Sequence, residues 1–190
     1  MNKTLFAAAI LATAGAAAHA EIATYTVDPT HTFANFEANH MGASTLRGRF
    51  DKKEGSVTLD KAAKTGKVEI TIDTSSISTG VAPLDTHLKS KDFFNATEFS
   101  TAKFVGDKFT FNGDKVSEVA GTRTLLGKTQ PVTLKATNFN CYINPMFKRE
   151  VCGGDFETTI SRSAYGMPFG INFGLPDNVR LLIQIEAIKQ

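Results

Sequence analysis

The chain has 190 residues, with 21 Lys or Arg and 19 Asp or Glu, so its formal net charge at pH 7 is +2. This balance excludes the strongly basic surface typical of nucleic-acid-binding proteins. Basic residues are interspersed with acidic ones, so the sequence shows no polybasic patch for a membrane surface either.

The first 20 residues predict a cleaved signal peptide. Lys3 gives the positive start, residues 5–18 are apolar, and Ala18-His19-Ala20 has the small-x-small cleavage pattern. The apolar stretch is too short to span a bilayer comfortably, which argues against a membrane anchor. We expect one periplasmic domain over residues 21–190, and its length of 190 − 20 = 170 residues suits a single core.

The mature sequence predicts strands nearly throughout because apolar and polar residues alternate. Residues 34–39, for example, place Phe36 and Ala38 on one face. Turn signals such as Asn112-Gly113 separate several of the strands. The other alternating segments are residues 46–51, 56–60, 67–73, 101–105, 108–113, 116–127, 131–140, 154–163 and 178–188.

One segment interrupts this pattern. Pro83 suits the first turn of a helix, and the residues after it predict a short helix near residues 83–90. Strands of this number either stack as a sandwich or close into a barrel. An eight-stranded barrel leaves room for side chains or one elongated ligand. Alternation alone does not separate the two, so it predicts only an antiparallel all-β domain.

The chain contains 15 phenylalanines and no tryptophan. Phe36, Phe50, Phe104 and Phe156 share their strand faces with small or β-branched residues. Such a mixture is typical of an ordinary core, but it would also line a cavity, because small residues leave room between rings. Both interpretations stay open at this point.

Cys141 and Cys152 are the two cysteines, and they flank the turn signal Asn144-Pro145. In an oxidising compartment they predict a disulfide that joins the two strands of a hairpin. The closed ring has 152 − 141 + 1 = 12 residues. The chain-entropy model gives such a ring about 2–3 kcal/mol of stabilisation. A redox-active pair would need a Cys-x-x-Cys motif, which the sequence lacks.

The mature chain has three histidines, His31, His40 and His87. None is spaced from another as metal-binding pairs usually are, so we expect no metal site. A buried, hydrogen-bonded structural role is expected for His31, and a capping or helix-packing role for His87. The sequence also lacks a Gly-x-Ser-x-Gly elbow and a phosphate-binding glycine loop. We therefore predict no catalytic residues and no enzyme activity, with a histidine-based metal enzyme as the remaining alternative.

Four arginines are of interest: Arg47, Arg49, Arg123 and Arg162. They are either solvated charges on strand faces, or one or two of them lie at a pocket mouth. Arginine there would contact the polar head of a ligand, because guanidinium makes bidentate contacts with phosphate or carbonyl-rich groups.

Four motifs in order resemble the YceI-like family of exported polyisoprenoid-binding proteins. Residues 25–51 are similar to the N-terminal signature of that family, and residues 71–104 to its most characteristic segment. Residues 121–134 resemble the stretch Gly-x-Leu-x-x-x-Gly-x-x-x-x-Pro-Val-x-Leu. Residues 160–167 resemble the closing Arg-Ser-x-x-Gly motif. The resemblance covers essentially the whole mature chain.

The resemblance implies an extended, lipocalin-like barrel of eight antiparallel strands around a long apolar tunnel. The ligand would be a ubiquinone-type quinone or a polyprenyl phosphate, with a fatty acid or fatty amide as an alternative and no other cofactor. A membrane-bound redox partner is left open. The tunnel lining is expected to include Phe36, Ala38, Leu46, Phe50, Ile70, Ile72, Phe104, Leu134, Phe156 and Ile160.

Other residues receive roles on the same grounds. His40 and Arg47 are the candidates for the head group at the tunnel mouth, in a first barrel hairpin formed by residues 31–50. His31 would organise one end of the barrel. Asp85 and His87 are expected to be structural.

The chain departs from the family pattern in two motifs. Family members often have Leu where the third motif of this chain reads Thr122-Arg123. The closing motif has Ala164 where an aspartate is common. The cysteine pair is not expected in every member. These departures leave the head group of the ligand open.

Overall fold

The computed structural model describes residues 22–190, and the predicted signal peptide lies outside this range. The described part contains eleven strands, one α-helix and three 3-10 helices. The strands are β1 (Ala23–Val27), β2 (Phe33–His40), β3 (Ser44–Phe50), β4 (Lys53–Asp60), β5 (Thr65–Asp73), β6 (Ile77–Ser78), β7 (Thr101–Asn112), β8 (Lys115–Leu125), β9 (Lys128–Ile143), β10 (Glu150–Ser161) and β11 (Asn178–Lys189). The helices are α1 (Ala82–Lys89), η1 (Thr74–Ser76), η2 (Ser163–Tyr165) and η3 (Ile171–Phe173).

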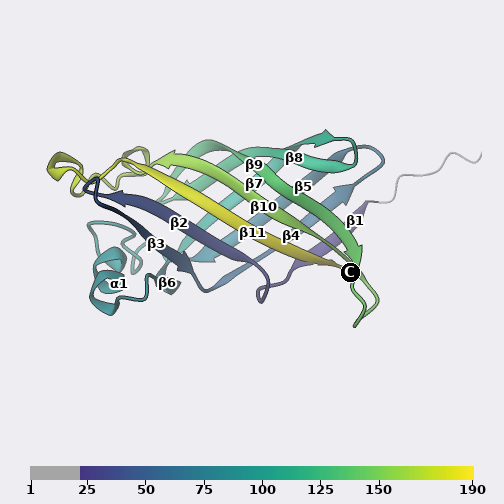
Figure 1. Ribbon diagram of the computed structural model, residues 1–190, viewed down its shortest axis with the longest axis horizontal. Helices are drawn as coiled ribbons and strands as arrows, with labels where there is room; N and C mark the ends of the chain where they lie inside the picture. Colours follow the sequence, from purple (N-terminus) through teal and green to yellow (C-terminus); the bar gives the residue numbers. More distant parts are fainter. Residues whose placement is uncertain (1–21) are drawn as a thin grey trace, which may run out of the picture.

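The strands form a closed antiparallel barrel (Figure 1). Neighbours follow the order β1-β4-β5-β7-β8-β9-β10-β11, and β11 pairs back onto β1, so eight strands complete the ring. The strands β2, β3 and β6 continue β1, β4 and β5 beyond a local break in each. Closure leaves no free sheet edge around the ring. The barrel prediction is confirmed, and a two-sheet sandwich is excluded.

The break between β1 and β2 is a hydrogen-bonded turn at Asp28. The Asp28 carboxylate accepts from the backbone N–H of Thr30 at 2.8 Å and contacts Nδ1 of His31 at 2.8 Å. This contact raises the pKa of the His31 imidazole. The His31 side chain is 62% exposed, on the barrel wall. His31 is hydrogen-bonded, as expected, but it is not buried, because it lies in the exposed turn between β1 and β2 and not at a barrel end.

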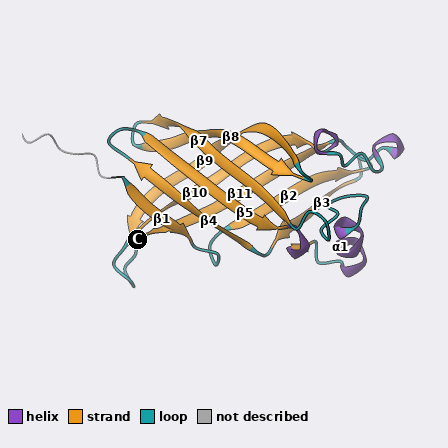
Figure 2. Ribbon diagram, turned by 180° about the vertical axis from the view of Figure 1, so that it is seen from behind, coloured by secondary structure: helices purple, strands orange, loops and turns teal. Residues whose placement is uncertain are grey.

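The two ends of the barrel differ. At one end lie the first described residues, the C-terminus and the hairpin between β9 and β10 (Figure 1). Cys141 and Cys152 lie directly opposite each other on these two strands and form a disulfide, as predicted. We call this the disulfide end. At the other end, the helix end, lie α1, the turn between β2 and β3, and the loop of residues 162–177 (Figure 2).

Helix α1 matches the predicted helix to within one residue at each end. Pro83 lies in its first turn, where its missing N–H costs no hydrogen bond. Asp85 holds the preceding segment, since its Oδ1 accepts from both the N–H and the hydroxyl of Thr79, each at 2.7 Å. None of the helices described over residues 22–190 is long and apolar enough to cross a membrane.

Candidate functional site

A cavity of about 510 Å³ occupies the barrel interior, and its lining extends from Tyr25 and Cys152 near the disulfide end to His40 and Phe169 at the helix end. Its wall consists of the inward-facing side chains that strand alternation places on one face. The structure places all ten residues of the predicted lining on this wall: Phe36, Ala38, Leu46, Phe50, Ile70, Ile72, Phe104, Leu134, Phe156 and Ile160. Their contact with a ligand stays a prediction. We call this cavity the tunnel.

The disulfide end of the tunnel is a packed floor. Tyr25, Leu59, Cys152 and Ala187 line it and pack in one cluster, and each is less than 9% exposed. This end offers no wide entrance for a ligand.

A polar network holds the floor in place. The Tyr25 hydroxyl donates to Glu150 Oε1, and Lys61 Nζ lies 2.6 Å from Glu150 Oε2. Burial and the contact with Glu150 raise the pKa of the Tyr25 phenol well above its usual value of 10. Burial opposes ionisation of Glu150, but hydrogen bonds from Lys61 and Tyr25 outweigh it and lower the pKa of that carboxyl.

The helix end is the mouth. Three residues that line the tunnel there, Asn39, His40 and Phe169, are exposed to solvent. The His87 ring packs edge-on against Phe93 and Phe169, with centroids 5.1 and 5.0 Å away, and its Nε2 lies 3.0 Å from Asp92 Oδ2. His40 lines the tunnel at this end and is exposed, and its contact with a head group stays a prediction.

Part of the mouth is roofed by the loop of residues 162–177. Arg162 is buried, and its Nε and Nη1 donate to the backbone carbonyls of Pro176 and Met167 at 2.8 and 2.6 Å. Asp177 accepts from the N–H and hydroxyl of Ser163 at 2.8 and 2.9 Å. Burial lowers the pKa of Arg162. The closing sequence motif therefore ties down this loop, and Arg162 is largely occupied with structural hydrogen bonds.

Aromatic rings form one side of the tunnel near the mouth. Phe50 lies between Phe36, at 6.2 Å, and Phe94, at 5.3 Å between ring centroids. Gly48 lies opposite Phe36 on the adjacent strand, and a Cβ there would come within 2.3 Å of the Phe36 ring. The sequence suggested that small residues leave room between the rings. At Gly48 they do not, because the Phe36 ring covers this glycine.

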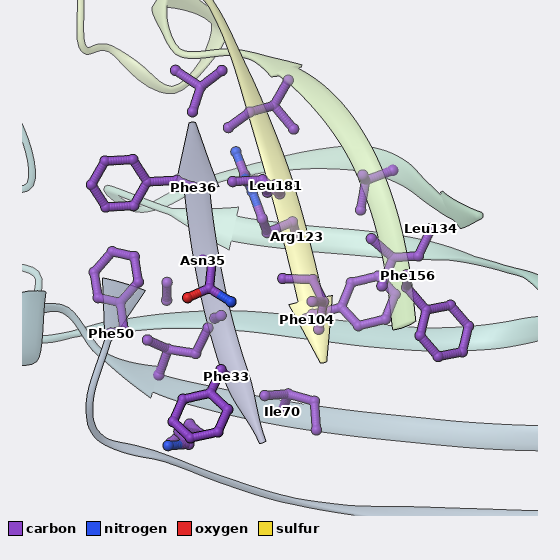
Figure 3. Close-up of a pocket in the computed structure, with 18 of the residues that line it drawn as sticks. Phe33, Asn35, Phe36, Phe50, Ile70, Phe104, Arg123, Leu134, Phe156 and Leu181 are labelled. Carbon is purple, nitrogen blue, oxygen red and sulfur yellow. The ribbon is translucent and has the colours of Figure 1, made fainter. Parts of the chain in front are cut away.

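The structure separates the four arginines. Arg47 and Arg49 point outward, where their Nε atoms pair with Glu37 and Asp51 at 2.8 Å. Arg47 is therefore not a mouth residue, since its neighbour Leu46 faces the tunnel and successive side chains on a strand alternate. Arg123 and Arg162 both line the tunnel. Figure 3 shows Arg123 among the apolar side chains that line the tunnel, and Phe104 is its partner on β7.

His31 lies in the exposed turn between β1 and β2, whereas His40 and His87 both line the tunnel at the helix end. Among residues 22–190, no group of three or more His, Cys, Asp or Glu side chains is placed to hold a metal ion. The sequence did not identify several lining residues that come from loops, among them Phe93, Met167 and Phe169. Loop residues carry no alternation, so no signal in the sequence marked them.

Fold and cavity define a lipocalin-like barrel that encloses one apolar tunnel. A family model described as the YceI-like domain matches residues 25–187. The chain therefore belongs to the YceI-like family.

Individual proteins agree with this assignment. The UPF0312 protein of Pseudomonas aeruginosa strain LESB58 is 34% identical over 193 residues, with 100% of both chains covered. The crystal structure of Burkholderia cenocepacia BcnA superposes with a TM-score of 0.70 at 24% identity, covering 84% of this chain and 98% of that one. A polyisoprenoid-binding domain from Saccharophagus degradans has a TM-score of 0.64 at 16% identity, covering 87% and 98%. At these identities the two structures show the fold alone.

Proposed function

We propose that this protein binds a long-chain isoprenoid lipid in the tunnel, and that it carries or sequesters this lipid in the periplasm without transforming it. The observation that carries the proposal is the tunnel itself, which extends from an exposed mouth to a buried floor between apolar side chains. Each buried CH₂ group contributes about 0.8 kcal/mol, so a prenyl chain gains a large free energy by leaving water for such a site.

Two further observations support this ligand class and compartment. The polyisoprenoid-binding domain from Saccharophagus degradans shares the fold over 87% of this chain. The first 20 residues have the pattern of a secretory signal peptide, which supports export.

The head group belongs to the same proposal. A ubiquinone-type quinone and a polyprenyl phosphate both join a prenyl tail to oxygen acceptors, which His40 at the mouth can meet. A membrane-bound redox partner would be relevant only for the quinone. A fatty acid or fatty amide is the second candidate, since an apolar tunnel selects chain length and apolarity more strongly than chemical class.

Mass spectrometry tests the proposal. Protein purified gently from its host is measured under native conditions, and its organic extract is then analysed. We expect a co-purifying prenylquinone or polyprenyl phosphate at a defined stoichiometry. A fatty acid or amide in its place would favour the second candidate. Protein that neither retains nor takes up any long-chain lipid would contradict both.

A variant locates the lipid. Phe156 is buried and faces the tunnel from β10, so Phe156→Arg is expected to abolish lipid retention by placing a charge in the tunnel. Thr159→Arg adds the same side chain on an exposed position of β10 and is the matched control. Circular dichroism establishes that each variant is folded. Full retention by a folded Phe156→Arg variant would place the lipid elsewhere.

A further inference from the structure

Arg123 occupies an inward position on an apolar wall, near the end of β8. It lies on β8, two residues from Gly121 and two from the buried Leu125, so all three share one face. Its register partners are Phe104 on β7 and Gln130 on β9. Alternation therefore directs this guanidinium into the tunnel, close to the helix end.

The guanidinium of Arg123 has few partners in the protein. Its Nε and Nη2 are buried and have no hydrogen-bond partner among residues 22–190. The ring of Tyr165 stacks on it, with Cζ of Arg123 4.1 Å from the ring centroid. Arg162 differs, because its Nε and Nη1 already donate to backbone carbonyls and only its Nη2 is without a partner among residues 22–190.

No carboxylate balances this charge inside the tunnel. Within the described part of the chain, the residues that line the tunnel include no Asp or Glu, and its other lysine or arginine side chains are Lys53 and Arg162. The ammonium group of Lys53 already has contacts within the protein, since its Nζ lies over the Phe33 ring and donates to the Asp51 carbonyl. The tunnel is therefore apolar with an excess of positive charge.

A buried, unpaired cation is unfavourable unless something supplies the missing charge and hydrogen bonds. Burial lowers the pKa of Arg123, and Tyr165 offsets this in part. A ligand with an anionic, oxygen-rich head would supply both. Arginine recognises such heads well, because its nitrogens form a planar fork that matches phosphate oxygens.

We propose that Arg123 binds the negatively charged phosphate head of a polyprenyl phosphate inside the tunnel, with the prenyl tail directed toward the floor at Tyr25. This inference rests on the proposed function and specifies its head group and orientation. Arg123 sits near the mouth, which leaves the length of the tunnel for the tail.

The test compares lipids with the same tail and different heads. Affinities of a polyprenyl phosphate, the matching neutral polyprenol and a prenylquinone of equal length are measured for the delipidated protein. Charge-assisted hydrogen bonds contribute about 1.5–3 kcal/mol each, so the phosphate should bind about 10- to 100-fold more tightly than the polyprenol. Arg123→Leu should remove this preference and leave polyprenol affinity unchanged. Arg49→Leu removes the same charge from the outer wall and should keep the preference.

The outcomes separate the two proposals. Wild-type protein that binds all three lipids equally, or an Arg123→Leu variant that keeps the phosphate preference, would overturn the role of Arg123 and leave isoprenoid binding intact. Binding of none of the three would overturn the proposed function itself. Arg123→Gln, which keeps a polar side chain without the charge, gives a second reading of the preference if the leucine variant folds poorly.

Thermal unfolding gives an independent readout. Replacing an unpaired buried charge by a hydrophobic residue is often neutral or stabilising. The lipid-free Arg123→Leu variant should therefore melt at the same temperature as wild type or higher. A large fall in Tm would assign Arg123 a structural role and contradict the inference.

Discussion

Glu150 illustrates how single side chains from distant parts of the chain close the floor of the tunnel. It accepts from Tyr25 on β1 and pairs with Lys61, which follows β4. The carboxylate must be ionised to hold both partners. Its side chain is 21% exposed, so solvent screens these contacts only in part.

A pH dependence follows for Glu150. Its folded pKa lies below the ordinary value of 4.5, so its contribution to stability is present above pH 4.5 and is lost as pH falls through the lowered pKa. Glu150→Gln should lower the free energy of unfolding at pH 7 and flatten its fall in the acidic range below pH 4.5. Denaturant titrations of both proteins across this range measure the difference. Parallel curves would show that Glu150 does not contribute through its charge.

The arginines show how far the sequence predicts the site at this scale. Strand alternation correctly separates Leu46 from Arg47, yet Arg47 was assigned to the mouth because it lies in the first hairpin. Arg123 alternates with outward Thr122 and Thr124 in the sequence, so the signal for an inward arginine was present. The sequence does not predict that two nitrogens of Arg123 have no hydrogen-bond partner, because this depends on which side chains the other strands bring to the wall.

At the scale of elements, the hairpin of β9 and β10 is the clearest case. Its disulfide joins directly opposed positions, and Cys152 also lines the tunnel floor. Replacing both cysteines by alanine should lower the free energy of unfolding by about 2–3 kcal/mol. Guanidinium titration measures this loss. Reductant should destabilise the wild type to a similar extent and leave the double variant unchanged; equal stability of all samples would contradict the prediction.

The sequence predicts where most of the strands lie, but it does not predict where a strand of the barrel is broken into two halves. Alternation identified the segments that became β2 to β5 and β7 to β11, and Pro83 marked α1. The breaks near Asp28 and η1 depend on side-chain hydrogen bonds, such as those of the Asp28 and Asp73 carboxylates. The two halves of a broken strand pair with the same neighbour, as β1 and β2 both pair with β11. This pairing is a property of the closed ring. Local sequence does not contain it.

At the scale of the whole molecule, the two ends of the tunnel differ. A closed floor at the disulfide end and an exposed mouth at the helix end give the ligand one route. Around the mouth, large apolar side chains from three separate segments are exposed: Met41 (55%), Val81 (53%), Phe169 (39%) and Phe173 (77%). The first and last of these segments touch, since a Cβ at Gly174 would lie 3.4 Å from the Met41 sulfur. The disulfide end also exposes apolar side chains, among them Ile143 (62%) and Met146 (88%). The open mouth and the proposed function together lead us to expect that the rim at the helix end faces the bilayer.

Phe173→Glu tests this orientation. The change removes the most exposed aromatic ring of the rim and adds a charge that a bilayer disfavours. Burying a phenylalanine contributes about 1.5–3 kcal/mol, so uptake of the lipid from vesicles should slow by about tenfold or more. Affinity for lipid delivered from ethanol should not change, because Phe173 does not line the tunnel. Phe147→Glu, at an exposed ring of the disulfide end, is the matched control and should leave the uptake rate unaltered. If instead only Phe147→Glu slows uptake, the disulfide end faces the membrane, and the lipid must then pass a floor in which Tyr25 is 1% exposed.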